Sequence, residues 1–559
     1  MTTQQTVIDA APVHVDQRAR IEILIAIMLT LFLSALDQTI VGTALPTIVT
    51  DLSGNQLYVW VVTVYLLAAT VSGPIYAKLS DLFGRRPMIM IGVSLFLLGS
   101  LLCGFSQEMW QLILFRGIQG LGAGAIFPIS LAIIGDLFSP RERGKYQGLF
   151  GAMFAVASII GPALGGFLTD TISWHWVFFV NLPLGLFALF VLWRLLPSVR
   201  HPEAVRSIDY AGAVVFAAAI VPFLIGLTNK QTGDWTDPLV GGLILLGVFL
   251  GAAFVWIESR AAEPIIPLSL FRNRTVAASI AATMLVTFGF FGAIIFLPRW
   301  FQFVQGSSAT ISGYQMLPLM AGVLGSSIGS GFIVSKTGRY KWMTVGAMLF
   351  SSIGIYFMTT ITAQTPIPLV WLWMFITGVG IGPSFAVFTI IVQSAVPVKM
   401  LGAATGSLTF FRQVGGSIGL AIAGTLFGST FIAEVPRQLA ARGVPQPIID
   451  GFSRNSGDLQ GQVTGVGVDL GQQILSSLPA AAQAAVEPFI GQIVTAIHEA
   501  FSLAVANAMW LALVGALGAA VIVAIAIPEL TLRRTVGEEA EGEEAERAEG
   551  RPSVIPAME

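Results

Sequence analysis

Charged residues are scarce in this sequence. Only 11% of its 559 residues are Asp, Glu, Lys or Arg, whereas 55% are hydrophobic, and the mean hydropathy is +0.80. Soluble globular chains carry about 25% charged residues, so the composition excludes a soluble enzyme and a disordered scaffold. The net charge of -2 offers no basic surface of the kind that nucleic-acid binders use.

Cysteine and metal-binding patterns are also nearly absent. Cys103 is the single cysteine, which excludes an internal disulfide and any cysteine-based metal or iron–sulfur site. The four histidines are scattered without the spacing of metal ligands. No Gly-x-x-x-x-Gly-Lys-Ser/Thr segment occurs, and the glycine-dense stretches 120–124 and 378–382 lie in apolar runs, which favours helix packing over nucleotide binding. We therefore expect no metal, no cofactor and no enzymatic activity.

Long apolar runs, by contrast, recur along the whole chain. A helix needs about 20 apolar residues to cross a bilayer, and continuous runs differ from the alternating pattern of a membrane β-barrel. The sequence therefore predicts an all-α membrane protein with about fourteen transmembrane helices. These lie at 20–45, 56–78, 87–106, 109–134, 146–169, 175–196, 208–228, 238–257, 275–297, 311–334, 342–362, 367–394, 403–432 and 498–527.

Positive charge is distributed unevenly between the connecting loops. With the N-terminus inside, twenty of the 29 Lys and Arg residues fall in inner loops and ends, and five fall in outer loops. Cytoplasmic loops of membrane proteins carry such an excess. We therefore predict an even number of helices in the inner (plasma) membrane of the cell, with both termini in the cytoplasm.

The two halves of the chain resemble each other at one fixed offset. Gly84-Arg85 matches Gly338-Arg339, 254 residues later. The same shift carries Lys145, Gly148, Gly161 and Gly165 onto Lys399, Gly402, Gly415 and Gly419. Repeats of this kind are typical of transporters built from two homologous bundles. The sequence thus predicts the two-bundle architecture, with two six-helix bundles plus two inserted helices.

These patterns divide the chain into five parts. They are a cytoplasmic N-terminal tail at 1–19, a first six-helix bundle at 20–196, a linker with two extra transmembrane helices at 197–274, a second six-helix bundle at 275–527, and an acidic cytoplasmic tail at 528–559. The composition of the acidic tail predicts disorder. The second bundle carries an outer insert at 434–497, which we expect to extend the flanking helices and to act either as a passive cap or as a vestibule that guides lipid or substrate.

Two charges lie deep inside predicted helices. Asp37 is in the segment LDQTIV at 36–41, and Arg116 is in the segment FRGIQG at 115–120. A carboxylate within a bilayer is costly and by default marks a functional site. Because the two residues lie at similar depths, we predict that Asp37 and Arg116 form a proton-coupling pair. The alternative is that Asp37 is a static charge partner.

The second bundle has no acidic residue before its outer insert. No Asp or Glu occurs between Glu263 and Glu434, so any proton site built on carboxylates must use the first bundle, chiefly Asp37, with Asp170 as the second candidate. Arg412 lies inside the predicted helix 403–432 and has three interpretations. It attracts anionic groups, extends to the inner surface, or holds a helix terminus.

The loop between the second and third helices combines glycines with both signs of charge. Its sequence is GPIYAKLSDLFGRR at 73–86. We predict that Asp81 and Arg85 form a conformational latch with Asp136, at the inner end of the fourth helix; the alternative is that the arginines only anchor the loop on the inner side. The latch candidates are Gly73, Asp81, Gly84, Arg85, Arg86 and Asp136.

The fifth helix carries the segment GPALGG at 161–166. Glycines four residues apart let helix backbones approach closely, and a proline removes a backbone donor and bends a helix. Gly161, Pro162, Gly165 and Gly166 are therefore candidates for a specialised bend.

Together these segments resemble the major facilitator superfamily, and specifically its fourteen-helix drug:proton antiporter branch. The loop at 73–86 resembles the signature of the superfamily, the segment at 115–120 resembles its helix-four proton-coupling motif, and the segment at 161–166 resembles its antiporter motif. The segment 36–46, Trp60 and Tyr65 are similar to the first two helices of this branch. The chain departs from several polyspecific relatives because its second bundle has no acidic residue before the outer insert. Its long insert resembles that of proposed lipid exporters.

The resemblance implies a proton-coupled antiporter that exports lipophilic or amphipathic compounds by alternating access. A second hypothesis is export of a lipid, a lipid-linked sugar or a self-made antibiotic, and a remote third is a non-transporting membrane sensor or scaffold. The proton gradient would be the energy source. We expect a monomer whose partners are protons, membrane lipids and a small amphipathic substrate. The candidates for a substrate cavity are Trp60, Tyr65, Gln119, Phe288, Phe291, Met316 and Arg412.

Overall fold

The computed structural model describes most of the chain. The described residues are 16–52, 57–138, 140–197, 209–230, 233–397, 400–454, 470–477, 483 and 486–529. Most of both predicted tails, Lys399 and much of the outer insert lie outside these ranges.

The described chain is helical and contains no strand within these ranges. Helices stand at all fourteen expected positions. Among the described residues, 12 helical spans are long and apolar enough to cross a membrane, and the two other positions are occupied by α5 and α14. The prediction of an all-α membrane protein is therefore confirmed.

The first half of the chain folds into seven helices, of which α6 is a single turn before α7. They are α1 (Gln17–Asp51), α2 (Tyr58–Phe83), α3 (Arg85–Gly104), α4 (Met109–Leu137), α5 (Pro140–Thr171), α6 (Trp176–Phe179) and α7 (Asn181–Leu195). The inserted pair follows, as α8 (Tyr210–Asn229) and as α9 (Leu243–Glu258), which is preceded by a π-helical turn η1 (Pro238–Gly242).

The second half is preceded by the short helix α10 (Ser269–Arg272) at the end of the linker. Its elements are α11 (Arg274–Phe303), α12 (Ala309–Gln315), α13 (Leu317–Thr337), α14 (Lys341–Met358), α15 (Ile367–Ser394), α16 (Leu401–Ala441), α17 (Gln446–Arg454), α19 (Leu470–Ser477), the 3-10 turn η3 (Glu487–Phe489) and α21 (Ile490–Ala526).

The two halves share one packing scheme. In the first half α1 packs against α5 and α7, and in the second α11 packs against α16 and α21. Likewise α4 packs against α2 and α3, and α15 packs against α13 and α14. The matched glycines Gly84 and Gly338 end α2 and α13 with φ angles of 95° and 69°, which glycine adopts without steric cost. The repeat seen in the sequence is therefore also a repeat of structure.

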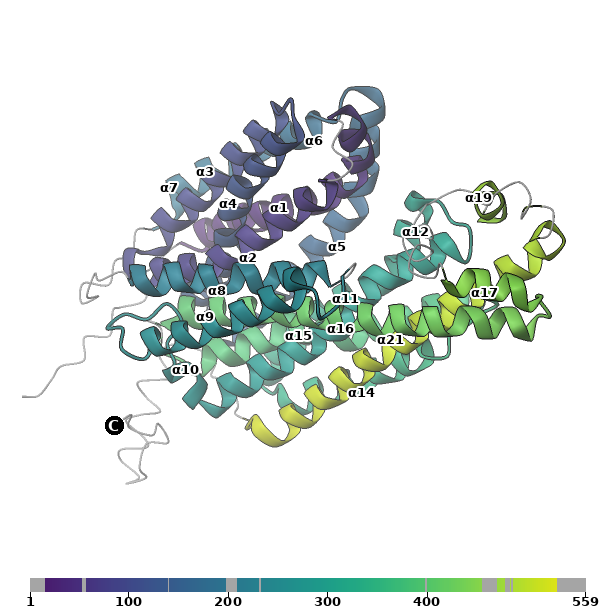
Figure 1. Cartoon of the computed structure of the whole chain (residues 1–559). Helices are drawn as coiled ribbons and strands as arrows, with labels where there is room; N and C mark the ends of the chain where they lie inside the picture. Colours follow the sequence, from purple (N-terminus) through teal and green to yellow (C-terminus); the bar gives the residue numbers. More distant parts are fainter. Residues whose placement is uncertain are drawn as a thin grey trace, which may run out of the picture.

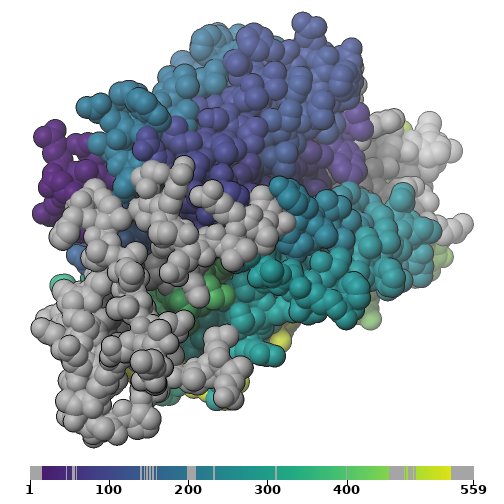
Figure 2. Space-filling model, turned by 90° about the vertical axis from the view of Figure 1, so that its left-hand side faces the viewer, coloured from purple at the N-terminus to yellow at the C-terminus, as the bar shows by residue number. Residues whose placement is uncertain are grey.

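The end of the molecule at which α1 begins and α21 finishes is referred to here as the inner end, and the opposite end as the outer end. In Figure 1 the purple and blue first half lies beside the green and yellow second half, with α12, α17 and α19 at the outer end. Viewed from the inner end, the first half lies above the second (Figure 2). The inserted helices α8 and α9 pack on each other, and α8 also contacts α2 and α16, so the pair covers the seam between the halves on one side.

Several helices are longer than the apolar runs that predicted them. α1 continues to Asp51, whose Oδ2 accepts a hydrogen bond of 2.7 Å from Trp174 Nε1. α16 continues to Ala441 and α21 starts at Ile490, so both flanking helices extend into the outer insert, as expected. Hydropathy detects only the part of a helix that lies in hydrocarbon, and backbone hydrogen bonds continue the helix beyond it.

Candidate functional site

The two intramembrane charges of the first half are in contact. Arg116 Nη1 donates to Asp37 Oδ2 at 2.5 Å, between α4 and α1. The side chain of Asp37 is 0% exposed and that of Arg116 is 1% exposed. The structure thus brings together the pair that sequence depth alone allowed.

Two amide side chains complete the shell around the carboxylate. Gln119 Nε2 donates to Asp37 Oδ1 at 2.7 Å, and Asn181 Nδ2 donates to the same oxygen at 3.2 Å. Gln119 Oε1 also accepts from Arg116 Nη1 at 2.8 Å, and Asn181 contacts Ser100 Oγ at 3.0 Å. Three donors on one carboxylate satisfy its lone pairs, which a buried charge requires.

Tyr65 of α2 closes this group of side chains. The guanidinium carbon of Arg116 lies 4.1 Å from the centroid of the Tyr65 ring, a geometry in which a cation is attracted to the ring face. Asp37, Tyr65, Arg116, Gln119 and Asn181 are called the charged cluster below.

For three residues of the charged cluster, the structure differs from the sequence-based prediction. Tyr65 and Gln119 were expected in a substrate cavity, yet they are 1% and 0% exposed and lie in the charged cluster, because their faces of α2 and α4 turn toward α1. Sequence reasoning missed Asn181. The available signal was an amide in an otherwise apolar run, but nothing in the run shows which helix it faces.

The glycines of α5 bring that helix against the segment that carries Asp37. A Cβ added at Gly165 would lie 2.8 Å from Ile40 O, and one added at Gly161 would meet the Thr39 side chain. Thr39 Oγ1 donates to Ala157 O at 3.0 Å. Gly166, in contrast, has open space where a Cβ would be. Pro162 lies inside α5 between the two contact glycines.

Three of the predicted latch residues, Asp81, Arg85 and Asp136, meet at the inner end. Arg85 forms an ion pair with Asp81, and its Nε donates to Asp136 Oδ2 at 2.9 Å. Arg86 donates to Trp193 O. Gly84 forms the turn between α2 and α3, and Gly73 faces the backbone of α4, with Gly124 O 3.5 Å from the position of an added Cβ.

Asp81 also joins the two halves. Its carboxylate oxygens accept hydrogen bonds from Gly402 N at 3.0 Å and Ala403 N at 2.7 Å, so it caps the N-terminus of α16, where the helix dipole favours an anion. Nearby, Gln393 Nε2 of α15 donates to Leu131 O of α4 at 3.1 Å. The inner ends of the halves are therefore held together in this structure.

The other cavity candidates are spread through the molecule. Trp60 is partly exposed near the start of α2, and Met316 is 8% exposed in the core between α12 and α13. Phe288 and Phe291 lie on α11 against Gly419 and Gly416 of α16. Arg412 lies on α16 with its guanidinium over Phe385.

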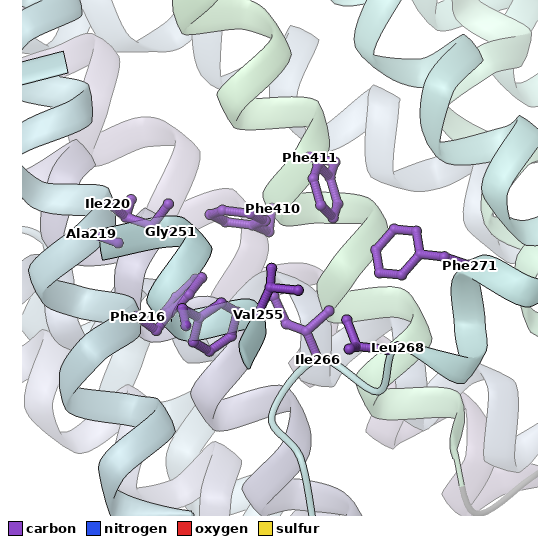
Figure 3. A pocket seen from close by; sticks show the side chains of 11 residues that line it. Phe216, Ala219, Ile220, Gly251, Val255, Ile266, Leu268, Phe271, Phe410 and Phe411 are labelled. Atoms are coloured by element: carbon purple, nitrogen blue, oxygen red, sulfur yellow. The ribbon is translucent and has the colours of Figure 1, made fainter. Parts of the chain in front are cut away.

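A separate apolar pocket of about 440 Å³ lies between the inserted pair and α16. Figure 3 shows its aromatic wall, with Phe216 of α8, Phe271 of α10, and Phe410 and Phe411 of α16 around the opening. None of the cavity candidates lines it. Within the described residues, no group of His, Cys, Asp and Glu side chains has the arrangement of a metal site.

Comparison with known families decides the identity of this fold. A family model described as Major Facilitator Superfamily matches residues 27–420. The chain belongs to the major facilitator superfamily. The solved structure of XylE, a proton:xylose symporter of this superfamily, is 15% identical, with a TM-score of 0.56 over 92% of this chain and 97% of that chain. The all-helical fold is therefore a major facilitator fold.

Curated relatives in the superfamily are transporters. "Multidrug transporter protein MdtP" of Bacillus subtilis is 36% identical over 463 residues, which cover 83% of this chain and 84% of the relative. "Acurin A biosynthesis cluster MFS-type transporter" of Aspergillus aculeatus is 33% identical over 447 residues, which cover 78% and 79% of the two chains. The resemblance to the multidrug-efflux branch of the major facilitator superfamily is thus confirmed.

Proposed function

We propose that this protein is a proton-coupled antiporter that exports lipophilic or amphipathic compounds. The observation that carries the proposal is the charged cluster, in which a fully buried carboxylate has both a cation and neutral donors around it. A group whose charged and neutral forms are both tolerated within a membrane is suited to take up and release a proton. The similarity to the multidrug transporter MdtP supports the export part of this proposal.

Alternating access links the charged cluster to the two halves. With Asp37 ionised, its attraction to Arg116 holds α1 against α4. Protonation from the outer side removes this attraction and accompanies substrate release, and proton release to the inner side resets the pair for the next substrate. The Asp81 cap on α16 favours the inner-closed arrangement, so it must open in each cycle.

The energetics fit this cycle without ATP or a bound cofactor. One charge moving inward gains about 2.3 kcal/mol per 100 mV, which sustains roughly a fifty-fold substrate gradient. The excess of Lys and Arg in loops at the inner end supports a topology with both termini in the cytoplasm, in the inner (plasma) membrane of the cell. We expect a monomer that handles one small molecule and protons in each cycle.

The test compares Asp37→Asn with wild-type protein in reconstituted vesicles carrying a pH gradient. Wild-type vesicles should accumulate a fluorescent amphipathic drug, and the variant should lose accumulation while keeping its thermal stability within a few degrees. Asp170→Asn is the control, because Asp170 is exposed at the outer end of α5 and should transport normally. Equal accumulation by wild type and Asp37→Asn would overturn the proposal.

A second candidate function is export of a lipid, a lipid-linked sugar or a self-made antibiotic. It is favoured by the absence of acidic residues between Glu263 and Glu434, by the outer insert, and by the relative from a biosynthesis cluster. A drug-susceptibility panel in an efflux-deficient host separates the candidates. Drug resistance that is lost in Asp37→Asn supports drug export. If the protein confers no resistance, and deleting its gene alters the envelope lipids, the second candidate function is supported. No change in either measurement would favour a sensor or scaffold.

A further inference from the structure

Arg412 is a buried cation that has no anionic partner in the part of the chain that the structure describes. Its side chain is 8% exposed. Its Nη2 is buried without a hydrogen-bond partner among the described residues. Its recorded contact is the ring of Phe385, whose centroid lies 5.0 Å from the guanidinium carbon. An unpaired charge in such a place is costly, so its presence calls for a reason.

Among the described residues, no carboxylate pairs with this arginine. The chain has no Asp or Glu between Glu263 and Glu434. In the first half, Asp37 is bound within the charged cluster, and Asp81 is bound to Arg85 and to the start of α16.

Two of the three interpretations of Arg412 do not fit the structure. A side chain that extends to the inner surface would expose its guanidinium, whereas this one is buried. Arg412 also lies 11 residues after the first residue of α16, about 16 Å along the helix, which places it near mid-membrane depth. No described carbonyl accepts a hydrogen bond from it, so it does not hold a helix terminus. The remaining interpretation is attraction of an anionic group.

The surroundings of Arg412 are aromatic. The Phe385 ring on α15 meets the Phe290 ring on α11 at a centroid distance of 5.4 Å, and Phe290 meets Phe291 at 5.9 Å. Phe291 packs against Gly416, one turn beyond Arg412. Phe291 and Phe385 are both partly exposed, so the aromatic cluster borders accessible space. Its composition suits a flat apolar body next to a negative charge.

We propose that Arg412 recognises an acidic group, a carboxylate or a phosphate, on the transported compound, whose aromatic or apolar body lies against Phe291 and Phe385. The planar guanidinium binds such groups through two parallel hydrogen bonds. This inference rests on the proposed export function and defines its substrate class as amphipathic acids. The same acidic group could belong to a small molecule or to a lipid headgroup.

Binding of matched probes to the purified full-length protein tests this inference. Pyrenebutyrate and pyrenebutanol share one aromatic body and differ in charge, and fluorescence anisotropy in phosphatidylcholine nanodiscs gives a Kd for each. Wild-type protein should bind the acid at least about tenfold more tightly, since a hydrogen bond to a charged group is worth one to two powers of ten. Equal Kd values in wild-type protein would overturn the proposal, whatever any variant does.

Variants then assign the preference to Arg412. Arg412→Gln should abolish it, and Arg412→Lys should retain part of it because the charge remains. Arg437→Gln is the control, since Arg437 is an exposed arginine on the same helix, 73% exposed and paired with Glu434, and should behave as wild type. A preference that survives in Arg412→Gln would overturn the assignment.

Two further arms separate the sources of the anion and the two proposals. Loss of the preference in nanodiscs that contain phosphatidylglycerol would assign the site to a lipid phosphate, and persistence would assign it to a small acid; both outcomes support an anion site. Because binding needs no gradient, wild-type protein should show the tenfold preference in nanodiscs, where no pH or voltage difference exists. Probe selectivity without gradient-driven transport would defeat the proposed antiport and leave the anion site standing.

Discussion

At the scale of single residues, the charged cluster shows how a carboxylate is kept out of water. Asp37 receives hydrogen bonds from Arg116, Gln119 and Asn181, which come from α4 and α7. A buried charge is tolerated when it is paired and its remaining lone pairs are satisfied. The neutral amides therefore matter as much to the site as the arginine does.

Asn181→Leu removes one donor from Asp37 and one donor from Ser100 Oγ, which still donates to Phe178 O at 2.8 Å. Losing a hydrogen bond to a charged group costs about 1.5–3 kcal/mol, so we expect roughly a tenfold or greater loss of gradient-driven export, measured in reconstituted vesicles. Asn507→Leu is the matched control, because Asn507 Nδ2 donates at 2.6 Å to the neutral Thr430 Oγ1, away from the cluster. It should lower thermal stability and keep proton coupling; an equal loss of coupling in both variants would contradict the role of Asn181.

At the scale of helices, small residues set the distance between α5 and α1. The predicted glycine pair in α5 lies against Thr39 and Ile40, two and three residues after Asp37. In the second half, the matched glycines Gly415 and Gly419 lie against Met284 and Phe288 of α11. Both halves thus use the same close approach to their first helix.

Two adjacent glycines of α5 give a matched pair of variants. In Gly165→Ala the new methyl group would press on the Ile40 carbonyl, and we expect overpacking to cost about 1–3 kcal/mol and to displace the segment that carries Asp37, with a clear loss of export. In Gly166→Ala the methyl group meets open space, so stability should be unchanged or higher by up to about 1 kcal/mol, from helix propensity. Thermal unfolding and export assays measure both, and equal behaviour of the two variants would refute the packing argument.

The Asp81 cap should bias the relative positions of the inner helix ends. Asp81→Asn weakens hydrogen bonds to two backbone N–H groups of α16, so the inner-closed population should fall by about one to two powers of ten relative to the open one. Spin labels replacing the exposed Arg194 and Arg272, in a Cys103→Ser background, report the separation of the inner ends by distance measurement. Glu263→Gln is the control, because the ion pair of Glu263 with Lys78 joins the linker to α2 and does not involve α16. An equally large change of the spin-label distance in this control would contradict the role of the Asp81 cap.

The sequence predicts the helices, the internal repeat and the charged pair, each from a different physical signal. Hydropathy marks the part of a helix in hydrocarbon, and the 254-residue offset between Gly84 and Gly338 marks equivalent turns. Depth along a helix can be counted, which brought Asp37 and Arg116 to one level. When a helix is buried on most sides, the sequence does not show which neighbouring helix a side chain faces. For this reason Gln119 and Tyr65 were expected in a cavity, and Asn181 was missed.

At the scale of the whole molecule, the two halves differ in charge although they share a fold. The membrane-embedded acidic group belongs to the first half, whereas the second half carries Arg412 without a carboxylate in its helices up to Glu434. A proton that moves inward transfers one positive charge, and an anionic acid that moves outward is electrically equivalent to a second one. If both move in each cycle, two charges move inward rather than one. At about 2.3 kcal/mol per charge per 100 mV, the sustainable gradient rises from about fifty-fold to about two-thousand-fold.

Voltage alone should therefore drive transport. In vesicles with a potassium diffusion potential and no pH difference, we expect wild-type protein to accumulate pyrenebutanol and to respond more steeply to voltage with pyrenebutyrate. Vesicles with Asp37→Asn correct for passive partitioning of both probes. Accumulation that ignores voltage for both probes would contradict a charge-moving cycle.

The length of α16 has a consequence outside the membrane. Its 41 residues make a rod of about 62 Å, whereas a bilayer with its headgroups is about 40–45 Å thick. Since α16 starts at the inner end, about 20 Å of it stands clear of the lipid on the far side, beside the equally extended start of α21. In the proposed topology this paired helical extension faces the outside of the cell, where it is a stiff epitope for an antibody fragment.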